Sequence, residues 1–187
     1  MYYNSTELES LGLKSYGKNV LISKKTSIYN PGNIEIGDNV RIDDFCILSA
    51  GTGGISIGCY VHIACYCLLI GAERIVLKDF SGLSSRVSIY SSTADYSGNY
   101  LTNPTVPDKF RNTISKAVTL DKHVVIGAST VILPGVHLHE GVAAGANCLI
   151  TKSFKQYSIL VGSPAKVLKQ RSEKLKDLEK NIIFEEL

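Results

Sequence analysis

Apolar residues recur at every sixth position along most of this chain, often with a glycine one place later and a small or apolar residue two places earlier. A period of six fits neither the roughly 3.6 residues per turn of an α-helix nor the alternation of a simple hairpin. It suits a strand of about three residues followed by a turn. The recurring core positions are Ile22, Ile28, Ile36, Ile42, Leu48, Ile57, Ile63, Leu69, Leu77, Leu83, Ile89, Leu120, Ile126, Ile132, Leu138, Ala144 and Ile150.

Three such units close one triangular coil of 18 residues, and we expect successive coils to pair through parallel backbone hydrogen bonds. Stacking then buries a continuous interior that no single coil buries alone. The corners need residues that tolerate left-handed backbone angles, and Asn39, Asp44 and Asn147 fall at such positions. The predicted fold is all-β, a parallel β-helix solenoid.

One long interruption breaks the period. Ile89 and Leu120 are 31 residues apart, which is 13 more than a full coil, so residues 91–115 must contain a loop that leaves the body. A long irregular loop on a rigid scaffold is where function concentrates, although a decorative insertion is the plain alternative.

The two ends of the chain do not follow the six-residue period, as expected for capping elements of a solenoid. Residues 1–19 form a predicted N-terminal cap, in which Thr6, Glu9 and Gly12 indicate a short capped helix. Residues 20–168 form the predicted β-helix. Residues 169–187 form a predicted amphipathic C-terminal helix that packs on the last coil or on a neighbouring subunit, with apolar residues at Leu175, Leu178, Ile182 and Leu187.

Composition limits the classes of partner and compartment. The chain has 187 residues, 44% of them apolar, which suits one domain, and its net charge of +3 is too small to favour nucleic acid. No apolar run approaches the roughly 18 residues of a membrane span, and the N-terminus lacks the order of a secretory signal. Five cysteines without a C-x-x-C pair argue against a disulfide framework or a zinc ribbon. We expect a soluble cytoplasmic protein with reduced thiols.

Three segments carry a family resemblance: residues 124–136 read VVIGASTVILPGV, 145–152 read GANCLITK and 161–166 read VGSPAK. Together they resemble the hexapeptide-repeat, left-handed β-helix acyltransferases, over nearly the whole chain. Residues 19–44 and 81–92 are similar to the sugar acetyltransferases of surface-polysaccharide pathways. The resemblance implies a homotrimer with active sites between adjacent β-helices, acetyl-CoA as donor, and a sugar hydroxyl or amine, free, nucleotide-linked or in a polysaccharide, as acceptor.

The charge distribution supports binding of the CoA donor. Residues 151–176 hold seven basic residues and one acid, an excess that suits the phosphates of CoA, although a solvated basic tail is the alternative. By matching motif positions, the resemblance implies phosphate contacts from lysines and a pantetheine path along small residues, whose backbone a ligand can approach closely. The implied cofactor-binding residues are Ala128, Gly145, Ala146, Thr151, Lys152, Lys166 and Lys169.

The base departs from the family pattern. Many relatives place a catalytic His in the long loop within a Ser-His-Asp-Tyr-Ser turn, whereas residues 92–97 here read STADYS, with Ala94 at the position of that His. Three explanations compete: the protein is inactive, Ala94 is an engineered change, or another residue serves as the base. We favour His62, whose position between inward Val61 and Ile63 points it outward, with Asp95 orienting it or binding a sugar hydroxyl. The alternative for His62 is burial in a trimer interface.

The remaining candidates are weaker. Tyr96 and Tyr100, with Ala94, are predicted to bind the acceptor, because a tyrosine ring packs on a sugar face, and a backbone N–H near Ala128 is predicted to stabilise the oxyanion. His123 is predicted to be structural, and His137 and His139 have no evident partner in the sequence. Carbonic anhydrases on this solenoid bind zinc through three His, two of them five residues apart; no two His here have that spacing, so we expect no metal.

The predicted function is acetyl-CoA-dependent acetyl transfer to a sugar, without a covalent enzyme intermediate. Burial is a better explanation than nucleophilic work for Cys59, Cys65 and Cys67. Two alternatives remain at this point: acetylation of a small non-sugar acceptor, and a catalytically silent trimeric binding protein.

Overall fold

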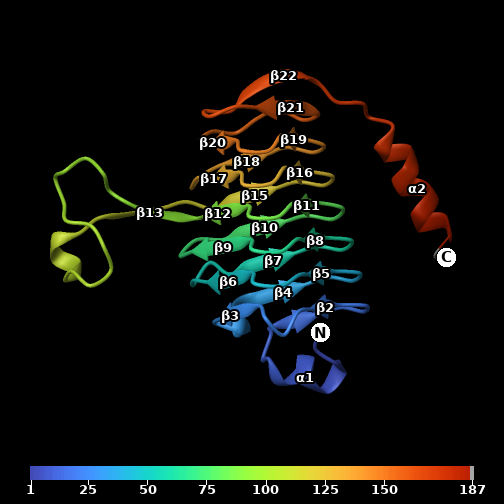
Figure 1. The fold of residues 1–187 in the computed structure, drawn as a ribbon, viewed down its shortest axis with the longest axis horizontal. Coiled ribbons are helices and arrows are strands. Elements are labelled where there is room, and N and C mark those ends of the chain that lie inside the picture. Colours follow the sequence, from blue (N-terminus) through green and yellow to red (C-terminus); the bar gives the residue numbers. More distant parts are fainter. Residues whose placement is uncertain (186–187) are drawn as a thin grey trace.

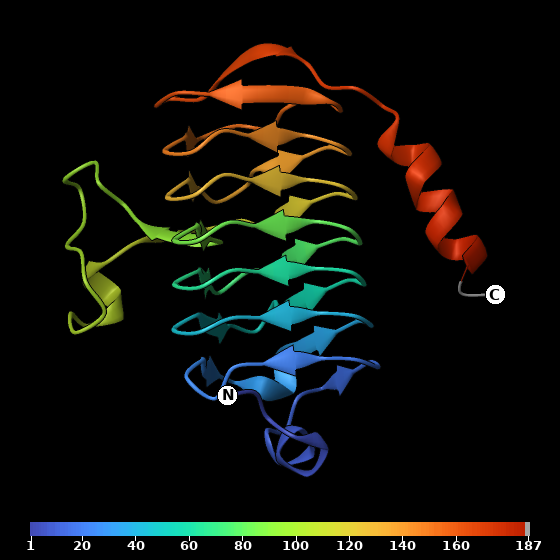
Figure 2. The ribbon, with the colours of Figure 1, turned by 45° about the vertical axis from the view of Figure 1, so that its right-hand side comes forward.

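The computed structural model describes the backbone of residues 1–185 and the side chains of residues 1–182, so the predicted helix residue Leu187 lies outside the described part. The chain winds into a left-handed, three-sided parallel β-helix whose coils stack one on another (Figures 1 and 2). This confirms the predicted fold class. The six-residue period produces it because each unit supplies one short strand and one corner.

Each side of the triangle is a parallel sheet. The first sheet contains β1 (Ser15–Tyr16), β4 (Ile34–Ile36), β7 (Ile55–Ile57), β10 (Ile75–Leu77), β15 (Val118–Leu120) and β18 (His137–Leu138). The second contains β2 (Leu21–Ile22), β5 (Arg41–Ile42), β8 (His62–Ile63), β11 (Gly82–Leu83), β16 (Val125–Ile126), β19 (Ala143–Ala144), β21 (Ser158–Val161) and, antiparallel to it, β22 (Lys166–Gln170). The third contains β3 (Ser27–Tyr29), β6 (Ile47–Ala50), β9 (Leu68–Gly71), β12 (Ser88–Tyr90), β17 (Val131–Ile132) and β20 (Leu149–Ile150).

The core runs along the axis of the β-helix. Of the predicted core positions, all are buried except Ile28, which is half-buried in the terminal coil, where no further coil covers it. Residues such as Ile63 and Leu69 have no exposed surface. Truncating one of them to alanine in a stacked core costs about 2–5 kcal/mol.

Corners are named here by the sheets they join: the first corner leads from the first sheet to the second, the second corner from the second sheet to the third, and the third corner from the third sheet to the first sheet of the next coil. Asn39 and Asn147 have positive φ angles, as predicted. The prediction for Asp44 is wrong, because the following residue, Phe45, takes the left-handed conformation. Bulky aromatic residues rarely adopt it, so their repeated presence at these corners is notable.

The predicted loop leaves at the third corner after β12 and projects away from the stack (Figure 1). Its stem is an antiparallel pair formed by β13 (Ser92–Ala94) and β14 (Thr113–Ser115), and its tip contains the 3₁₀ turn η2 (Asp108–Phe110). Another 3₁₀ turn, η1 (Pro31–Asn33), precedes β4.

Both ends carry helices. The helix α1 (Ser5–Ser10) is capped by Asn4 and Glu7, whose side chains each accept from the other's backbone N–H, so the predicted cap at Thr6 and Glu9 is two residues late. The helix α2 (Leu175–Glu185) runs beside the stack rather than across its last coil (Figures 1 and 2). Its Glu179 contacts Lys122 and His123 at 2.8 and 2.7 Å. No helix in the described part of the chain has the length and apolarity needed to cross a membrane.

Candidate active site

The second corner carries a column of residues that occupy the same position in successive coils, here called the corner column. Four of its five carbonyls accept a hydrogen bond from the next coil: Tyr66 N donates to Asp44 O, Arg86 N to Cys65 O and Ser129 N to Ser85 O, each at 3.0 Å, and Asn147 N donates to Ala128 O at 2.9 Å. The corner column is therefore a straight run of backbone with short side chains. Its members are Asp44, Cys65, Ser85, Ala128 and Ala146.

A hollow of about 350 Å³ lies beside the corner column, lined by residues that include His62, Gly82 and Ser85. Gly82 pairs in register with His62 on one side and Val125 on the other. A Cβ on Gly82 would meet nothing nearer than 4.0 Å, and its φ is not left-handed, so the backbone does not require glycine there. The missing side chain instead leaves room, and we call this space the Gly82 hollow.

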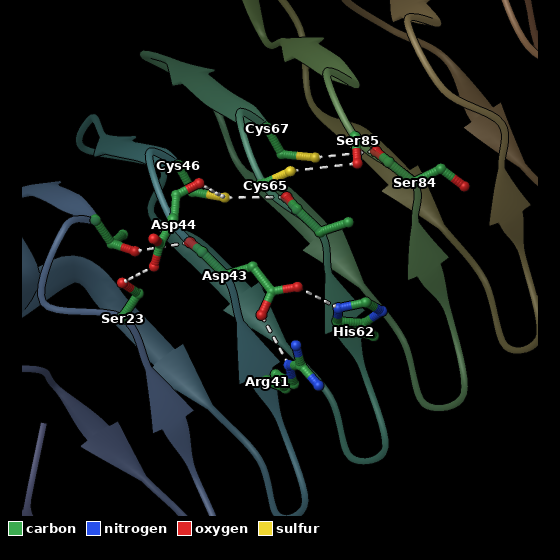
Figure 3. A network of polar contacts seen from close by, with 12 residues as sticks. Ser23, Arg41, Asp43, Asp44, Cys46, His62, Cys65, Cys67, Ser84 and Ser85 are labelled. Atoms are coloured by element: carbon green, nitrogen blue, oxygen red, sulfur yellow. Dashed lines mark hydrogen bonds and ion pairs between the residues drawn. The ribbon is translucent and has the colours of Figure 1, made fainter. Parts of the chain in front are cut away.

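His62 points outward at the edge of the Gly82 hollow, with 52% of its side chain exposed. Its Nε2 lies 2.8 Å from Asp43 Oδ2, while Arg41 Nε donates to Asp43 Oδ1 at 2.7 Å (Figure 3). Burial of Asp43 favours the neutral carboxyl, but the hydrogen bonds from His62 and Arg41 outweigh it and lower the pKa of Asp43. A charged carboxylate therefore orients the imidazole, as in a base–orienter pair.

A second hollow, of about 390 Å³, lies on the other side of the His62–Asp43 hydrogen bond. It is lined by residues that include Phe45 and Tyr66, whose rings stack at 5.0 Å and are each about half exposed. Arg86 lies over the Tyr66 ring at 5.7 Å. This aromatic stack offers a flat face with cations nearby, an arrangement suited to a base and its phosphates.

The loop holds Asp95 apart from this groove. Asp95 accepts from Ser97 N at 2.7 Å and from Asn112 Nδ2 at 3.0 Å, and these hydrogen bonds lower the pKa of its carboxyl. Tyr96 is 84% exposed. No contact within the described residues joins Asp95 to His62, so in a single chain Asp43, not Asp95, orients the imidazole.

The other residues predicted to bind the acceptor, Ala94, Tyr96 and Tyr100, do not share one hollow. Ala94 lines a hollow of about 230 Å³ between the two arms of the loop, together with Asn112. Tyr96 and Tyr100 do not line it, and Tyr100 is 47% exposed. The described chain therefore does not bring the predicted acceptor residues together at one place.

The predicted cofactor residues also fall into two groups. Ala128 and Ala146 lie on the corner column, with Gly145 beside Ala146; Val161 lies 3.4 Å from a Cβ built on Gly145 and pairs with Lys166 of β22. This first group follows one edge of the β-helix. Thr151 and Lys152 lie at the far end of β20, at the third corner, and Lys169 pairs with Ile159.

The remaining histidines have partners that sequence reasoning missed. His123 is buried, has a left-handed backbone and bonds to Glu179, consistent with a structural role. The statement that His137 and His139 lack a partner is wrong, because both approach Asp121, at 2.8 and 3.6 Å. A sequence signal existed: Asp121 and His139 are 18 residues apart, the length of one coil.

Comparison with known proteins identifies the family of this chain. No family model matches the chain. A dTDP-4-amino-4,6-dideoxy-D-glucose acyltransferase from Escherichia coli is 49% identical over 95% of this chain and 93% of its own length. The chain belongs to the hexapeptide-repeat, left-handed β-helix acyltransferases. It is a CoA-dependent acyltransferase that acts on a sugar hydroxyl or amine, as predicted, and this membership sets aside the silent binding protein.

Two further similar proteins are a relative of lower sequence identity and a protein of known structure. WbbJ of E. coli K12, a putative lipopolysaccharide O-acetyltransferase, is 27% identical over 82% of this chain and 80% of its own length. AntD, an N-acyltransferase from Bacillus cereus, has been solved with dTDP and 3-hydroxybutyryl-CoA; it is 46% identical, with a TM-score of 0.93, over 98% of this chain and 97% of AntD. Further AntD structures carry replacements of an aspartate, or of a serine ten positions before it.

Proposed function

We propose that this acyltransferase transfers an acyl group from acyl-CoA to the amine of a dTDP-linked 4-amino-4,6-dideoxyhexose. The 49% identical relative is named for that sugar nucleotide, and AntD has been solved in complex with it and CoA. The stacked Phe45 and Tyr66 rings suit the thymine base, and Arg41 and Arg86 suit the diphosphate.

One observation carries the proposal. The replaced serine and aspartate of AntD are ten positions apart, and Ser85 and Asp95 form the only Ser–Asp pair with that spacing in this sequence. Ser85 lies where the corner column meets the Gly82 hollow. Asp95 lies in the segment where the family's loop His would be expected. We infer that these two residues act at the reacting atoms.

The pair requires a neighbouring protomer. The loop projects from the third corner of the stack (Figure 2), and Asp95 is on this loop, directly after β13, whereas Ser85 is at the second corner. We propose a homotrimer in which the loop of one protomer reaches the corner column of the next, so that every active site is shared. Tyr96 and Tyr100 then approach the acceptor of the neighbour rather than their own Gly82 hollow.

The chemistry follows from the acceptor. The amine nitrogen attacks the thioester carbon, the carbon–sulfur bond breaks, CoA leaves as the thiol, and one proton leaves the nitrogen. A neutral amine attacks through its lone pair without first losing a proton, and its N–H becomes more acidic once the C–N bond forms, so a carboxylate such as Asp95 can accept that proton. A hydroxyl is a weak nucleophile until its proton is being removed, so it would call for a stronger base. An amine acceptor therefore explains why Ala94 can replace the loop His.

The donor lies along the corner column in this proposal. Small side chains at Ala128 and Ala146 let an extended pantetheine arm approach the backbone, and the Ala128 N–H is placed to stabilise the oxyanion. Lys166, beside Gly145, binds a CoA phosphate, with Lys169 nearby on β22. Thr151 and Lys152, at the third corner, contact the donor held by the adjacent protomer.

His62 is the second candidate for the base. Its hydrogen bond to Asp43 at 2.8 Å and its place at the edge of the Gly82 hollow favour it. If His62 takes the proton, Asp95 binds a hydroxyl or the amine of the sugar. Because both cosubstrates carry several negative charges and do not cross membranes unaided, we place the reaction in the cytoplasm.

The test is an acceptor panel, with release of free CoA thiol as the signal. We expect dTDP-4-amino-4,6-dideoxyglucose to be acylated at least about a hundredfold more efficiently than dTDP-glucose, which offers a hydroxyl at the same carbon. Acetyl-CoA and 3-hydroxybutyryl-CoA should be compared as donors. Equal turnover of the amine and hydroxyl sugars, or turnover of other sugars only, would overturn the proposal.

A further inference from the structure

Two imidazoles and one carboxylate converge at the first corner, on the upper coils. His137 Nε2 lies 2.8 Å from Asp121 Oδ2, and His139 Nδ1 lies 3.6 Å from the same oxygen. The ring centroids of His137 and His139 are 4.0 Å apart. One ligand atom from each of the three residues lies within 4.8 Å of the others.

The fold fixes this arrangement. Leu120 and Leu138 pair in register between β15 and β18, so Asp121 and His139, the next residues in each coil, stack at the same corner position. His137 is two residues before His139 and reaches the same oxygen from β18. The three donors are thus held by two adjacent coils rather than by one flexible loop.

The cluster has no part in the proposed acyl transfer. It lies at the first corner, whereas the corner column and the Gly82 hollow lie at the second. The two imidazoles are nearly half exposed, at 41% and 47% of their side chains, while Asp121 is 14% exposed. Packing of the core therefore does not account for two histidines here.

We propose that Asp121, His137 and His139 bind one transition-metal ion, with Zn²⁺ as the natural occupant. Imidazole nitrogens with a carboxylate oxygen form a donor set that Zn²⁺, Co²⁺, Ni²⁺ and Cu²⁺ accept. Bonds of about 2.0–2.2 Å in a tetrahedral site place ligand atoms roughly 3.4 Å apart, which small rotamer adjustments of this cluster reach. Mg²⁺ and Ca²⁺ prefer several oxygen ligands and are disfavoured.

Lys78 supplies the outer support. Its Nζ lies 2.5 Å from Asp121 Oδ1, so that oxygen is held by the ammonium and Oδ2 alone faces the imidazoles. An outer partner of this kind orients a metal-binding carboxylate. Three protein ligands leave a coordination position for water.

The chain contains its own comparison site. His62 and Asp43 form a His–Asp pair with the same 2.8 Å separation and similar imidazole exposure, but with one imidazole and an Arg in place of the second. A single imidazole and one carboxylate oxygen do not form a chelating set. Zn²⁺ should therefore bind at the Asp121 cluster and not at the His62–Asp43 pair.

The test uses the full chain without a polyhistidine tag, freed of metal by a chelator. Calorimetric titration should show one Zn²⁺ per chain, and Co²⁺ should give the visible absorption of a low-coordinate site. His137→Ala, His139→Ala and Asp121→Asn should each weaken Zn²⁺ binding by about tenfold or more, since loss of even an outer partner costs that much. His62→Ala should leave it unchanged, and Mg²⁺ should not bind.

Stability without metal controls for folding. If a variant at the cluster melts at the temperature of the parent chain in chelator, loss of binding reports a lost ligand. Added Zn²⁺ should raise the melting temperature of the parent and of His62→Ala but not that of His139→Ala. The proposal is overturned if His137→Ala and His139→Ala bind Zn²⁺ as tightly as the parent does. It is also overturned if the parent does not bind one Zn²⁺ per chain.

Discussion

Gly82 pairs in register with His62, so the imidazole of one coil stands beside a position without a side chain on the next. Neighbouring strands bring side chains at paired positions into contact, and an empty position in such a row is a defined space. This relationship supplies the space on the stack that the proposed active site offers to the acceptor.

Filling the Gly82 hollow should impair catalysis without unfolding the protein. We expect Gly82→Val to lower kcat/KM for the sugar nucleotide by about tenfold or more, because the new side chain occupies acceptor space. Its melting temperature should stay close to that of the parent, since a Cβ there meets nothing nearer than 4.0 Å. Steady-state kinetics and thermal melts measure the two effects.

Gly37→Ala is the matched control for that variant. A Cβ on Gly37 would lie 2.7 Å from the backbone of Gly58, so this substitution should destabilise the fold although Gly37 is at another corner. If Gly82→Val destabilises as much as Gly37→Ala, glycine at position 82 is structural.

Asp95→Asn should reduce kcat by about 10²–10⁴-fold while the stability is unchanged, because its carboxylate accepts the proton in the proposed reaction. Asp108→Asn, in the same loop, should keep full activity. The pKa of Asp95 is lowered from 3.8, so its carboxylate adds no acid limb of its own above about pH 4, and any limb above that pH comes from the acceptor amine or from another group.

The pH profile separates the two candidate bases. A histidine accepts a proton only in its neutral form, so a histidine base gives the profile an acid limb of its own. An acid limb that vanishes in His62→Gln, with Asp95→Asn nearly as active as the parent, would assign the base to His62.

Mixed oligomers test whether the active site is shared. Ser85→Ala and Asp95→Asn, each expected to be poorly active alone, should regain activity when the two chains are refolded or coexpressed together. A site then forms wherever an intact loop meets an intact corner column on the neighbouring chain. The thiol-release assay measures the gain, and a mixture no more active than its components would place both residues in one protomer.

The aromatic stack at the second corner should serve the acceptor, not the donor. Tyr66→Asn should raise KM for the sugar nucleotide about tenfold while KM for acyl-CoA is unchanged, because stacking on a base contributes about 1–3 kcal/mol. Asparagine is chosen because it tolerates the positive φ of this position. Phe80→Asn, in the stack at the first corner, should leave both KM values unchanged.

Asp43 should make stability depend on pH in the acid range. Its pKa is lowered in the folded state, so the stability it contributes is present above its unfolded value near 3.8 and is lost as the pH falls through the lower folded value. Urea unfolding between pH 3 and 7 should show a smaller acid loss in Asp43→Asn. An identical acid loss in both proteins would show that other carboxylates account for it.

The sequence predicts the solenoid well because burial imposes its period directly: every sixth side chain must face the axis, and only Ile28, at the open end, escapes full burial. It predicts the active site less well. His62 is placed correctly as outward, but its partner Asp43 is not predicted. The extra residues at 51–54 lengthen this coil from 18 to 21 residues, so His62 pairs with Arg41, and Asp43 lies two residues farther along the chain. In the proposed site Asp95 comes from a second chain, and the pattern of one sequence does not place residues of two chains relative to each other.

The corner column also sets fixed distances along the β-helix axis. Successive coils are spaced like adjacent strands, about 4.8 Å apart, so Ala146 and Ser85 are separated by two steps, or roughly 10 Å. Inserting one whole coil between them would leave the interior packing intact yet carry the serine one step beyond the reach of a donor anchored at Lys166. In the proposed arrangement the number of coils, and not only the residues in them, therefore determines where the thioester lies relative to Ser85.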